Sequence, residues 1–458
     1  MKKYCNNILI IFLIVISWFM LQGCKKDWLD KKPDISLVVP TTLTDLQALL
    51  DNTLQAFNSG NCMLGEFACD DYYVTPTTYR TLASLARNSY IWADTIYSPG
   101  TGTGWVKQYT QIFYANVVLD RLKSITTGQG NNQYNAVKGS ALFYRAFAYF
   151  DLVQVYAKPY TSNTKNDLGL PLNILPIVDQ KLPRSTLEDT YQLILDDLEA
   201  SALALPTTAS YKTQPTKPAA YALLARVYLS MQKYTQAYSA ADSALTLYNT
   251  LLDYNNLDTT ASVPIPENND EIIYANKLAD ATFGPGKAIC DSNLYSMYQS
   301  EDLRKAVYFK RNASGGPYIY GRYSGSSSTA LFDGMAVDEV YLVRAECAAR
   351  LGKIQPAMND LNTLLKTRWK AGAFQNLTAD NADTALAIIL RERRKELCFR
   401  GLRWGDLRRL NMDNRFTVTL TRDIDGIKYT LLPNSDRYVF PIPPLETDYN
   451  PNVVQNPR

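Results

Sequence analysis

Two stretches of the chain, residues 219–247 and 339–365, show the clearest periodic alternation of apolar and polar positions. Each has apolar residues at helical spacing on both sides of a short break, which falls at residues 231–234 in the first stretch. A break this short fits a tight turn between two antiparallel helices. Both stretches are therefore predicted to form helical hairpins whose apolar faces pack on neighbouring helices.

Small residues recur at matching places in the two hairpins. The matching positions are Ala225, Tyr228, Ala237, Ala241 and Ala244 in the first, and Ala345, Ala348, Ala357, Leu361 and Leu364 in the second. This spacing resembles a tetratricopeptide repeat, in which small side chains let helices approach closely. A weaker third copy is predicted to begin at Ala146 and Tyr149, although Lys158 and Pro159 fall in its second helix. A plain bundle of amphipathic helices is the alternative interpretation.

The remaining pattern predicts more helices and two long irregular regions. Helices are expected at residues 44–58, 106–122, 134–156, 186–204 and 384–399, and a β-hairpin within residues 415–440. Residues 62–105 and 249–335 lose the helical period and are rich in aromatic residues and glycine, and residues 159–184 form an extended connection. Irregular segments this long are uncommon in compact domains and are usually functional.

The predicted fold is therefore mainly α: an α-α superhelix of tetratricopeptide-like hairpins with long irregular loops and a small β-hairpin element. It is expected to occupy residues 44–458 as a single large domain, with repeats at about residues 106–158, 186–247 and 336–370.

The first 23 residues have the pattern of an export signal. Lys2 and Lys3 precede an apolar run at residues 8–20, which is shorter than the roughly 20 residues that span a bilayer. Residues 21–24 resemble a lipobox, so cleavage is predicted to leave Cys24 as a lipid-carrying N-terminus. Residues 1–23 are thus expected to be a lipoprotein signal peptide and residues 24–43 a lipid-anchored tether, with ordinary secretion as the alternative.

Composition excludes several classes of function. The formal charge of +3 falls to +1 when the signal peptide removes two lysines and no acid, so there is no electrostatic footprint for nucleic acid. The chain has no histidine, which excludes Ser-His-Asp and Cys-His catalysis and nearly all catalytic zinc sites. The chain has 32 tyrosines and 15 phenylalanines, and this excess of tyrosine indicates many aromatic rings with one edge exposed to water.

Five cysteines follow Cys24: Cys62, Cys69, Cys290, Cys347 and Cys398. Their odd number and wide spacing argue against a disulfide framework or a metal knuckle, and no metal site or cofactor is predicted. Cys347 and Cys398 lie in helical patterns and are expected to be buried. A disulfide between Cys62 and Cys69, and a structural calcium, are left open.

Three groups of polar residues have competing explanations. Acids and bases interleave at helical spacing in residues 391–409, which favours ion pairs over an anion site and predicts a buried corner at Trp404 and Asp406. Asp423 and Asp425 share only part of the spacing of a calcium loop, so a hairpin turn is expected there. The acids Asp70 and Asp71 are candidates to contact sugar hydroxyls rather than to act as a glycosidase pair.

Taken together, these motifs resemble the SusD/RagB family of nutrient-binding lipoproteins. The matching segments are residues 24–30, 145–152, 159–160, 169–172, 183–186, 392–397, 401–409, 441–443, 450–452 and 455–457, with Arg400 and Gly405 departing from the pattern. The resemblance implies a mostly helical domain with tetratricopeptide-like pairs as scaffold and a ligand site on long loops. It also implies a location on the outside of the outer membrane, as a lid on a SusC-like TonB-dependent transporter that receives glycan, or in some members peptide.

The candidate ligand-binding residues come from the two irregular regions. A pyranose ring has an apolar C–H face that can stack on tyrosine or tryptophan, while polar side chains bind its hydroxyls. The candidates are Trp92, Tyr295, Asn88, Asp94, Tyr72, Tyr73 and Tyr320. This assignment is regional, and the alternative is that each ring anchors its own loop.

The predicted function is binding of oligosaccharide or polysaccharide nutrients at the cell surface and their delivery to the transporter, without catalysis. The alternatives are a peptide-binding member of the same family and a scaffold that binds only the transporter.

Overall fold

The computed structural model describes residues 40–458 except residues 54–55, 59–62, 100–101, 127 and 327–328. The chain divides into two compact units, Met1–Thr41 and Thr42–Arg458. The predictions for the signal peptide, Cys24 and most of the tether lie outside the described residues. The fold described below is that of Thr42–Arg458.

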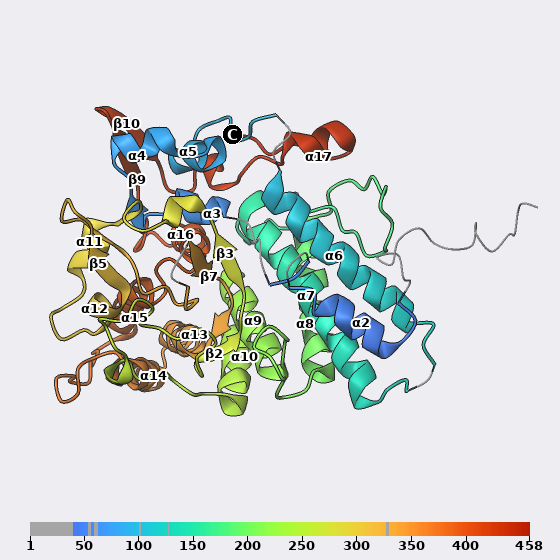
Figure 1. The fold of residues 1–458 in the computed structure, drawn as a ribbon, viewed down its shortest axis with the longest axis horizontal. Helices are drawn as coiled ribbons and strands as arrows, with labels where there is room; N and C mark the ends of the chain where they lie inside the picture. Colours follow the sequence, from blue (N-terminus) through green and yellow to red (C-terminus); the bar gives the residue numbers. More distant parts are fainter. Residues whose placement is uncertain (1–39, 54–55, 59–62, 100–101, 127, 327–328) are drawn as a thin grey trace, which may run out of the picture. The chain divides into compact units, whose positions relative to one another are not determined.

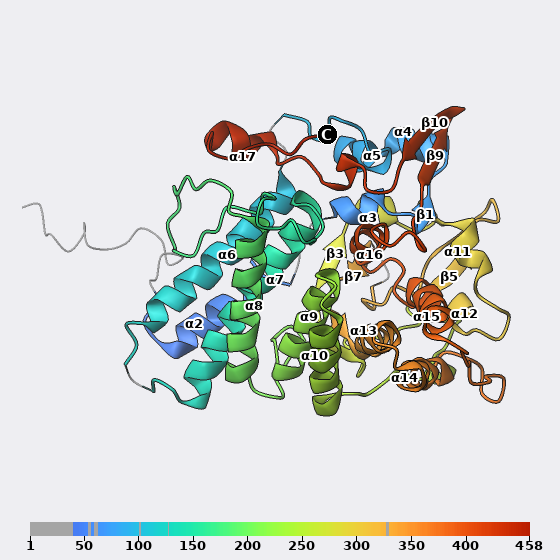
Figure 2. The ribbon, with the colours of Figure 1, turned by 180° about the vertical axis from the view of Figure 1, so that it is seen from behind.

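Long helices form the frame of this unit. They are α6 (Thr103–Leu122), α7 (Asn132–Tyr156), α8 (Leu187–Ala204), α9 (Lys217–Ser230), α10 (Tyr234–Leu247), α13 (Val337–Arg350), α14 (Ile354–Lys366) and α15 (Ala382–Glu396). Each helix from α6 to α10 packs on the next, α10 packs on α13, and α13 contacts both α14 and α15. Figures 1 and 2 show this succession from two sides, with α2 (Leu43–Leu50) against α6 and α7. The mainly α prediction is confirmed.

Both predicted hairpins form, and their small residues lie at the helix contacts. Ala225 and Ala241 are fully buried between α9 and α10, and Ala345 and Ala357 are fully buried between α13 and α14. The α13–α14 turn places Gly352 at φ 74°, a conformation that costs glycine little because it has no Cβ. Close backbone approach at alanine therefore sets the hairpin geometry.

Three predicted details of the helices are wrong. Helix α2 ends at Leu50 rather than near residue 58, because Asn52 and Thr53 are weak helix formers. Helix α7 runs unbroken for 25 residues, so no third hairpin begins at Ala146; instead α7 pairs with α6 and α8. Helix α16 (Arg403–Leu410), within the predicted charged segment, was not expected as a separate helix.

The irregular regions contain short elements. The helices are α3 (Leu64–Ala68), α4 (Pro76–Thr81), α5 (Ser84–Tyr90), α11 (Ser292–Ser296) and α12 (Arg304–Tyr308), with α17 (Pro444–Tyr449) near the C-terminus. The strands are β1 (Tyr72–Tyr73), β2 (Ile272–Tyr274), β3 (Lys277–Ala279), β4 (Ile289–Cys290), β5 (Phe309–Arg311), β6 (Pro317–Ile319), β7 (Ala330–Phe332) and β8 (Met335–Ala336). They form one four-stranded sheet, β1-β4-β6-β5, and the pairs β2-β8 and β3-β7.

The predicted β-hairpin consists of β9 (Leu420–Ile424) and β10 (Ile427–Leu431). Its two-residue turn is Asp425 and Gly426, at φ 52° and 81°. Positive φ at both positions is the backbone that an Asp-Gly turn supplies between antiparallel strands, so the turn prediction is confirmed.

Candidate functional site

The four-stranded sheet joins the two irregular regions. Strand β1 comes from residues 62–105 and strands β4, β5 and β6 come from residues 249–335. The register places Tyr73 opposite Ile289, Ile289 opposite Tyr318, and Tyr318 opposite Lys310. Because paired residues point to the same face of a sheet, these four side chains form one row.

This row reaches solvent at Tyr73, Tyr318 and Lys310, while Ile289 between Tyr73 and Tyr318 is only 5% exposed. Tyr73 is 41% exposed, and Tyr318 and Lys310 are half-buried. Tyr320 follows β6 directly; its hydroxyl donates to the Ala261 carbonyl at 2.8 Å, and the Lys310 Nζ lies 3.5 Å from its ring centroid. We call Tyr73, Lys310, Tyr318 and Tyr320 the tyrosine face. It offers aromatic rings and one cation to a ligand.

The inward side of the same sheet belongs to the core. Tyr72 is 1% exposed, its hydroxyl donates to the Phe67 carbonyl at 3.0 Å, and its ring packs on Tyr90, Phe283 and Phe399. Burial raises the pKa of Tyr72 well above its usual value, so the hydroxyl stays neutral. The tyrosine face is thus backed by tight aromatic packing.

Three cations lie around the β5 strand. Lys310 belongs to the tyrosine face, while Lys305 and Arg311 approach the Tyr295 ring at 5.1 and 5.5 Å. Tyr295 itself packs edge-on against Phe309, which is on the inward side of β5. None of the three cations forms an ion pair with a carboxylate of the described residues, so their charge is available to a ligand.

Trp92 and Tyr72 do not present a ring to solvent, and we withdraw both as stacking residues. Trp92 is 1% exposed, its indole N–H donates to the Ala68 carbonyl at 3.0 Å, and the Arg422 guanidinium lies 5.2 Å from its ring. A partner inside the fold satisfies the polar edge of each ring, and the rest of the ring packs in the core. In both residues, the ring anchors its own loop, as the alternative interpretation had it.

The other predicted residues lie in different surroundings. Tyr73 and Tyr320 both belong to the tyrosine face, whereas Tyr295 lies at its edge, beyond β5. The Asn88 amide donates to the Ile96 carbonyl at 3.3 Å and so closes its own loop. Asp94 is exposed and forms an ion pair with Arg437 at 2.8 Å. The structure therefore brings together two of the seven candidates.

Asp71 is buried, and Asp70, whose side chain is 13% exposed, is bound by arginines, so neither acid is placed to contact sugar hydroxyls as expected. Asp70 binds Arg403 through both carboxylate oxygens, at 2.6 and 2.9 Å, and also Arg394 at 3.0 Å. Although burial opposes ionisation, these two guanidinium groups hold the pKa of Asp70 well below its usual range. Asp71 is 1% exposed and accepts the Phe399 backbone N–H at 3.2 Å.

Tyr318 and Lys310 were not among the sequence candidates. A signal for them is present, because Tyr318 and Tyr320 are two residues apart and follow Gly315 and Gly316. Aromatic and aliphatic residues on both sides of these glycines are typical of a β-hairpin, and the i, i+2 spacing of the two tyrosines places them on one face.

The predicted ion-pair role of residues 391–409 is confirmed. Arg393 binds Asp406 at 2.8 Å, Arg409 binds Glu346 at 2.5 Å, and Trp404 and Asp406 are buried.

Cys69 is a free, buried thiol whose Sγ donates to the Glu66 carbonyl at 3.3 Å, and Cys62 lies outside the described residues. Among the described helices, none is long and apolar enough to cross a membrane.

Two family models match this sequence. The family described as "Starch-binding associating with outer membrane" matches residues 27–229, and the SusD family matches residues 337–458. Two relatives from Formosa agariphila are similar along most of their length. SusD-like protein P2 is 26% identical over 77% of this chain and 79% of its own. SusD-like protein P38 is 25% identical over 100% of this chain and 99% of its own.

Solved structures share the fold. A putative sugar binding protein from Bacteroides vulgatus is 24% identical, with a TM-score of 0.72 over 92% of this chain and 99% of its own. A SusD superfamily protein from Bacteroides thetaiotaomicron is 22% identical, with a TM-score of 0.73 over 91% of this chain and 100% of its own. At this level of identity, the likeness shows a common fold.

Proposed function

Because the chain belongs to the SusD/RagB family, whose models match more than half of its length, we propose that it binds glycan nutrients at the cell surface and passes them to a SusC-like TonB-dependent transporter. The role requires no catalysis, which agrees with a chain that has no histidine.

The tyrosine face is the proposed glycan site, and the observation that carries it is the row of Tyr73, Tyr318 and Lys310 on one exposed side of a sheet. The C–H face of a pyranose stacks on a tyrosine ring, and Lys310 donates to ring hydroxyls or to a sugar carboxylate. Tyr320 is anchored through its hydroxyl and keeps Lys310 in place. The strands and the core behind them preorganise these groups, which lowers the entropy cost of binding.

Isothermal titration of the purified mature chain against neutral glycans, uronate-containing glycans and peptides tests this proposal. We expect binding to at least one glycan, weaker binding for Tyr73→Ala, and unchanged binding for Tyr211→Ala. Tyr211 is a suitable control because it is 69% exposed and lies between α8 and α9. Binding to peptides without binding to any glycan would favour the peptide-binding alternative instead.

We propose that a second surface binds the transporter. Exposed aliphatic and aromatic residues gather along the extended connection and α17: Leu168, Ile174, Leu175, Ile177, Val178, Leu445 and Tyr449. The Tyr449 hydroxyl donates to Asp179 at 3.1 Å and Lys181 lies 4.5 Å from its ring, so the two segments are adjacent. Exposed apolar patches with a polar rim are typical of protein interfaces. We call these seven residues the apolar edge.

Affinity capture of the transporter from solubilised outer membranes tests the apolar edge. Val178→Asp, at a residue that is 78% exposed, should reduce the amount captured without changing glycan affinity. Leu203→Asp is the matched control, because Leu203 is 81% exposed at the end of α8, outside the apolar edge. Equal capture by both variants would place the transporter elsewhere on the surface.

A further inference from the structure

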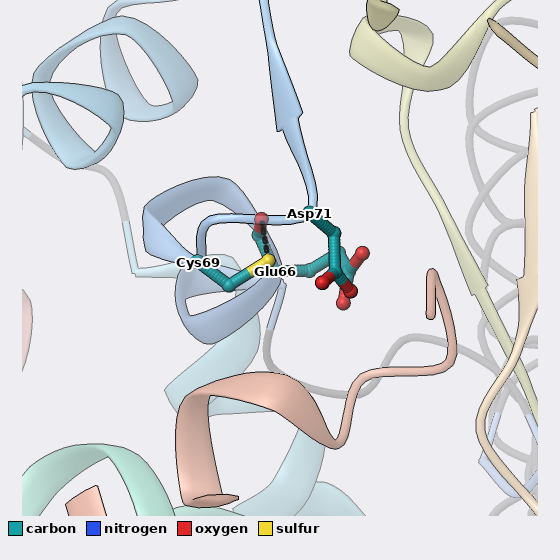
Figure 3. Close-up of side chains that lie close together, drawn as sticks. All are labelled: Glu66, Cys69 and Asp71. Atoms are coloured by element: carbon teal, nitrogen blue, oxygen red, sulfur yellow. Dashed lines mark hydrogen bonds between the residues drawn. The ribbon is translucent and has the colours of Figure 1, made fainter. Parts of the chain in front are cut away.

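Three potential metal ligands meet where α3 leads into β1. Glu66, Cys69 and Asp71 each offer one ligand atom, and these atoms all lie within 4.8 Å of one another. Figure 3 shows their side chains together beside the short helix, with the Cys69 sulfur turned back to the Glu66 carbonyl. All three residues are buried, with exposed fractions of 2%, 0% and 1%.

Each of the two carboxylates has one held oxygen and one free oxygen. Glu66 Oε2 accepts the Gly401 N–H at 3.0 Å, and Asp71 Oδ2 accepts the Phe399 N–H at 3.2 Å. Glu66 Oε1 and Asp71 Oδ1 are buried and have no hydrogen-bond partner within the part of the chain that the structure describes. Phe399 has φ 57°, a strained backbone for a bulky residue, and Gly401 has φ 72°. The strained segment aims two backbone donors at the cluster.

Neither carboxylate has an ion-pair partner among the described residues. Other buried acids do: Asp197, Glu339 and Glu346 have arginine nitrogens at 2.7, 2.6 and 2.5 Å. Two adjacent buried carboxylates without an ion-pair partner of their own are costly, and the nearby Arg394 and Arg403 are paired with Asp70 instead. A further positive charge would therefore stabilise the Glu66 and Asp71 carboxylates.

A second group of close acids shows what compensation by the protein looks like. Glu271, Asp338 and Glu396 are as close together and as buried as the first group. There, Arg368 binds Glu271 and Glu396 at 2.5 and 2.6 Å, and Arg400 binds Asp338. Arginine fills that site, so proximity of acids alone does not imply a metal. In the Glu66 group, no arginine or lysine of the described residues forms an ion pair with either carboxylate, since the nearby Arg394 and Arg403 bind Asp70.

We propose that Glu66 Oε1, Asp71 Oδ1 and Cys69 Sγ bind a structural zinc ion. Zinc accepts carboxylate oxygen and thiolate sulfur together, whereas calcium and magnesium prefer oxygen ligands. On binding, the Cys69 S–H bond breaks, its proton passes to solvent, and the thiolate becomes a zinc ligand. A cavity of about 70 Å³ is lined in part by Gly65, which precedes Glu66, and by Gly401, whose N–H Glu66 accepts.

Such an ion would fix the base of the tyrosine face. Asp71 directly precedes β1, and its other oxygen binds the segment after α15. Zinc would therefore link α3, β1 and residues 399–401 on the inward side of the sheet. The inference does not depend on the proposed glycan function, since a structural ion is compatible with any ligand.

Metal content tests the proposal directly. The full mature chain is unfolded, refolded with ZnCl₂ under reducing conditions, dialysed, and measured by inductively coupled plasma mass spectrometry. We expect about one zinc per chain, because the three ligands form one site. Cys69→Ala and the nearly isosteric Asp71→Asn should lose it, while Cys347→Ala should keep it. Cys347 is a buried free thiol in α13 and is the matched control for thiol loss.

Cobalt gives a readout that does not depend on stability. Refolding with CoCl₂ should produce a thiolate-to-cobalt charge-transfer band in the wild-type chain and in Cys347→Ala, and no such band in Cys69→Ala. Circular dichroism confirms that each variant is folded. A wild-type chain that retains no zinc and shows no band would overturn the proposal, and would leave a proton shared by the two carboxyls as the compensating charge. Equal zinc content in Cys69→Ala would also overturn it.

Discussion

Replacing Arg304 by methionine tests how strongly buried charge holds the irregular regions to the scaffold. The Arg304 side chain is fully buried on α12. Its guanidinium contacts Asp302 at 2.8 and 2.7 Å, Glu396 at 3.0 Å and Glu392 at 2.7 Å. The last two acids lie on α15, so this one side chain joins the second irregular region to the long helix. Arg304→Met removes the charge and keeps most of the apolar stem.

The size of the effect follows from what stays paired. Breaking a buried ion pair costs about 3–5 kcal/mol because it leaves an uncompensated charge. Here Lys395 still contacts Asp302 and Glu392 at 2.8 and 3.0 Å, and Arg368 still contacts Glu396 at 2.6 Å. The remaining cations reduce the penalty, so we expect a loss near the lower end, about 3 kcal/mol in the free energy of unfolding.

Urea unfolding followed by circular dichroism measures this loss, and an exposed pair provides the control. Arg80 binds Asp425 with side chains 59% and 49% exposed, so Arg80→Met should cost about 1 kcal/mol or less. The Arg304→Met deficit should also shrink as pH falls, because the orphaned carboxylates become neutral on protonation. A deficit for Arg304→Met no larger than that for Arg80→Met would refute the reasoning.

Three further changes have defined outcomes. Tyr73→Ala should raise the Kd for a bound glycan by about 5- to 10-fold in calorimetry, because stacking on one exposed ring contributes about 1 kcal/mol to the binding free energy. Burial raises the pKa of Glu271 to about 8. The stability that the neutral Glu271 carboxyl contributes is therefore complete below about pH 4.5 and is lost as pH rises through about 8. Glu271→Gln should be more stable than the wild-type chain above pH 8, as measured by urea unfolding. Gly321→Ala should cost about 1–3 kcal/mol, because a Cβ there would lie 1.8 Å from the Val307 carbonyl oxygen, while Gly405→Ala meets only the flexible end of Gln154 and should cost less than about 1 kcal/mol.

The helical frame was predictable because its signal is local. In residues 219–247 the period, the short break and the alanine spacing all lie within one stretch, and α9 and α10 begin and end close to the expected residues. The prediction of a third hairpin was wrong because α7 continues through Ala146. One long helix and the start of a hairpin have the same local period, so the sequence pattern does not distinguish them. The resemblance to the SusD/RagB family, which depends on many short motifs in order, was confirmed.

The candidate site was only partly predictable, because strand pairing across more than 200 residues decides which rings face out. Tyr72 and Tyr73 are neighbours in sequence, yet Tyr72 points to the core and Tyr73 to solvent. Their orientation depends on the register that pairs Tyr73 with Ile289, which no local pattern specifies. Trp92 has the composition of a ligand residue, but its N–H meets the Ala68 carbonyl inside the fold. The aromatic content of the sequence therefore indicated the irregular regions but not which of their residues face solvent.

The same dependence on distant partners explains why one side of a charged helix is buried. Helix α15 looks like a solvated surface helix by composition, yet Glu392, Arg393, Lys395 and Glu396 are all buried. Their partners lie on other elements: Arg304 on α12 for the two glutamates, and Asp406 on α16 for Arg393. Apolar packing fixes the long helices of the frame but cannot position short strands that bury little surface. Bidentate arginine contacts can position these short strands, because each contact is directional and is satisfied in one geometry only. The ion pairs of α15 therefore place the irregular regions that carry the tyrosine face.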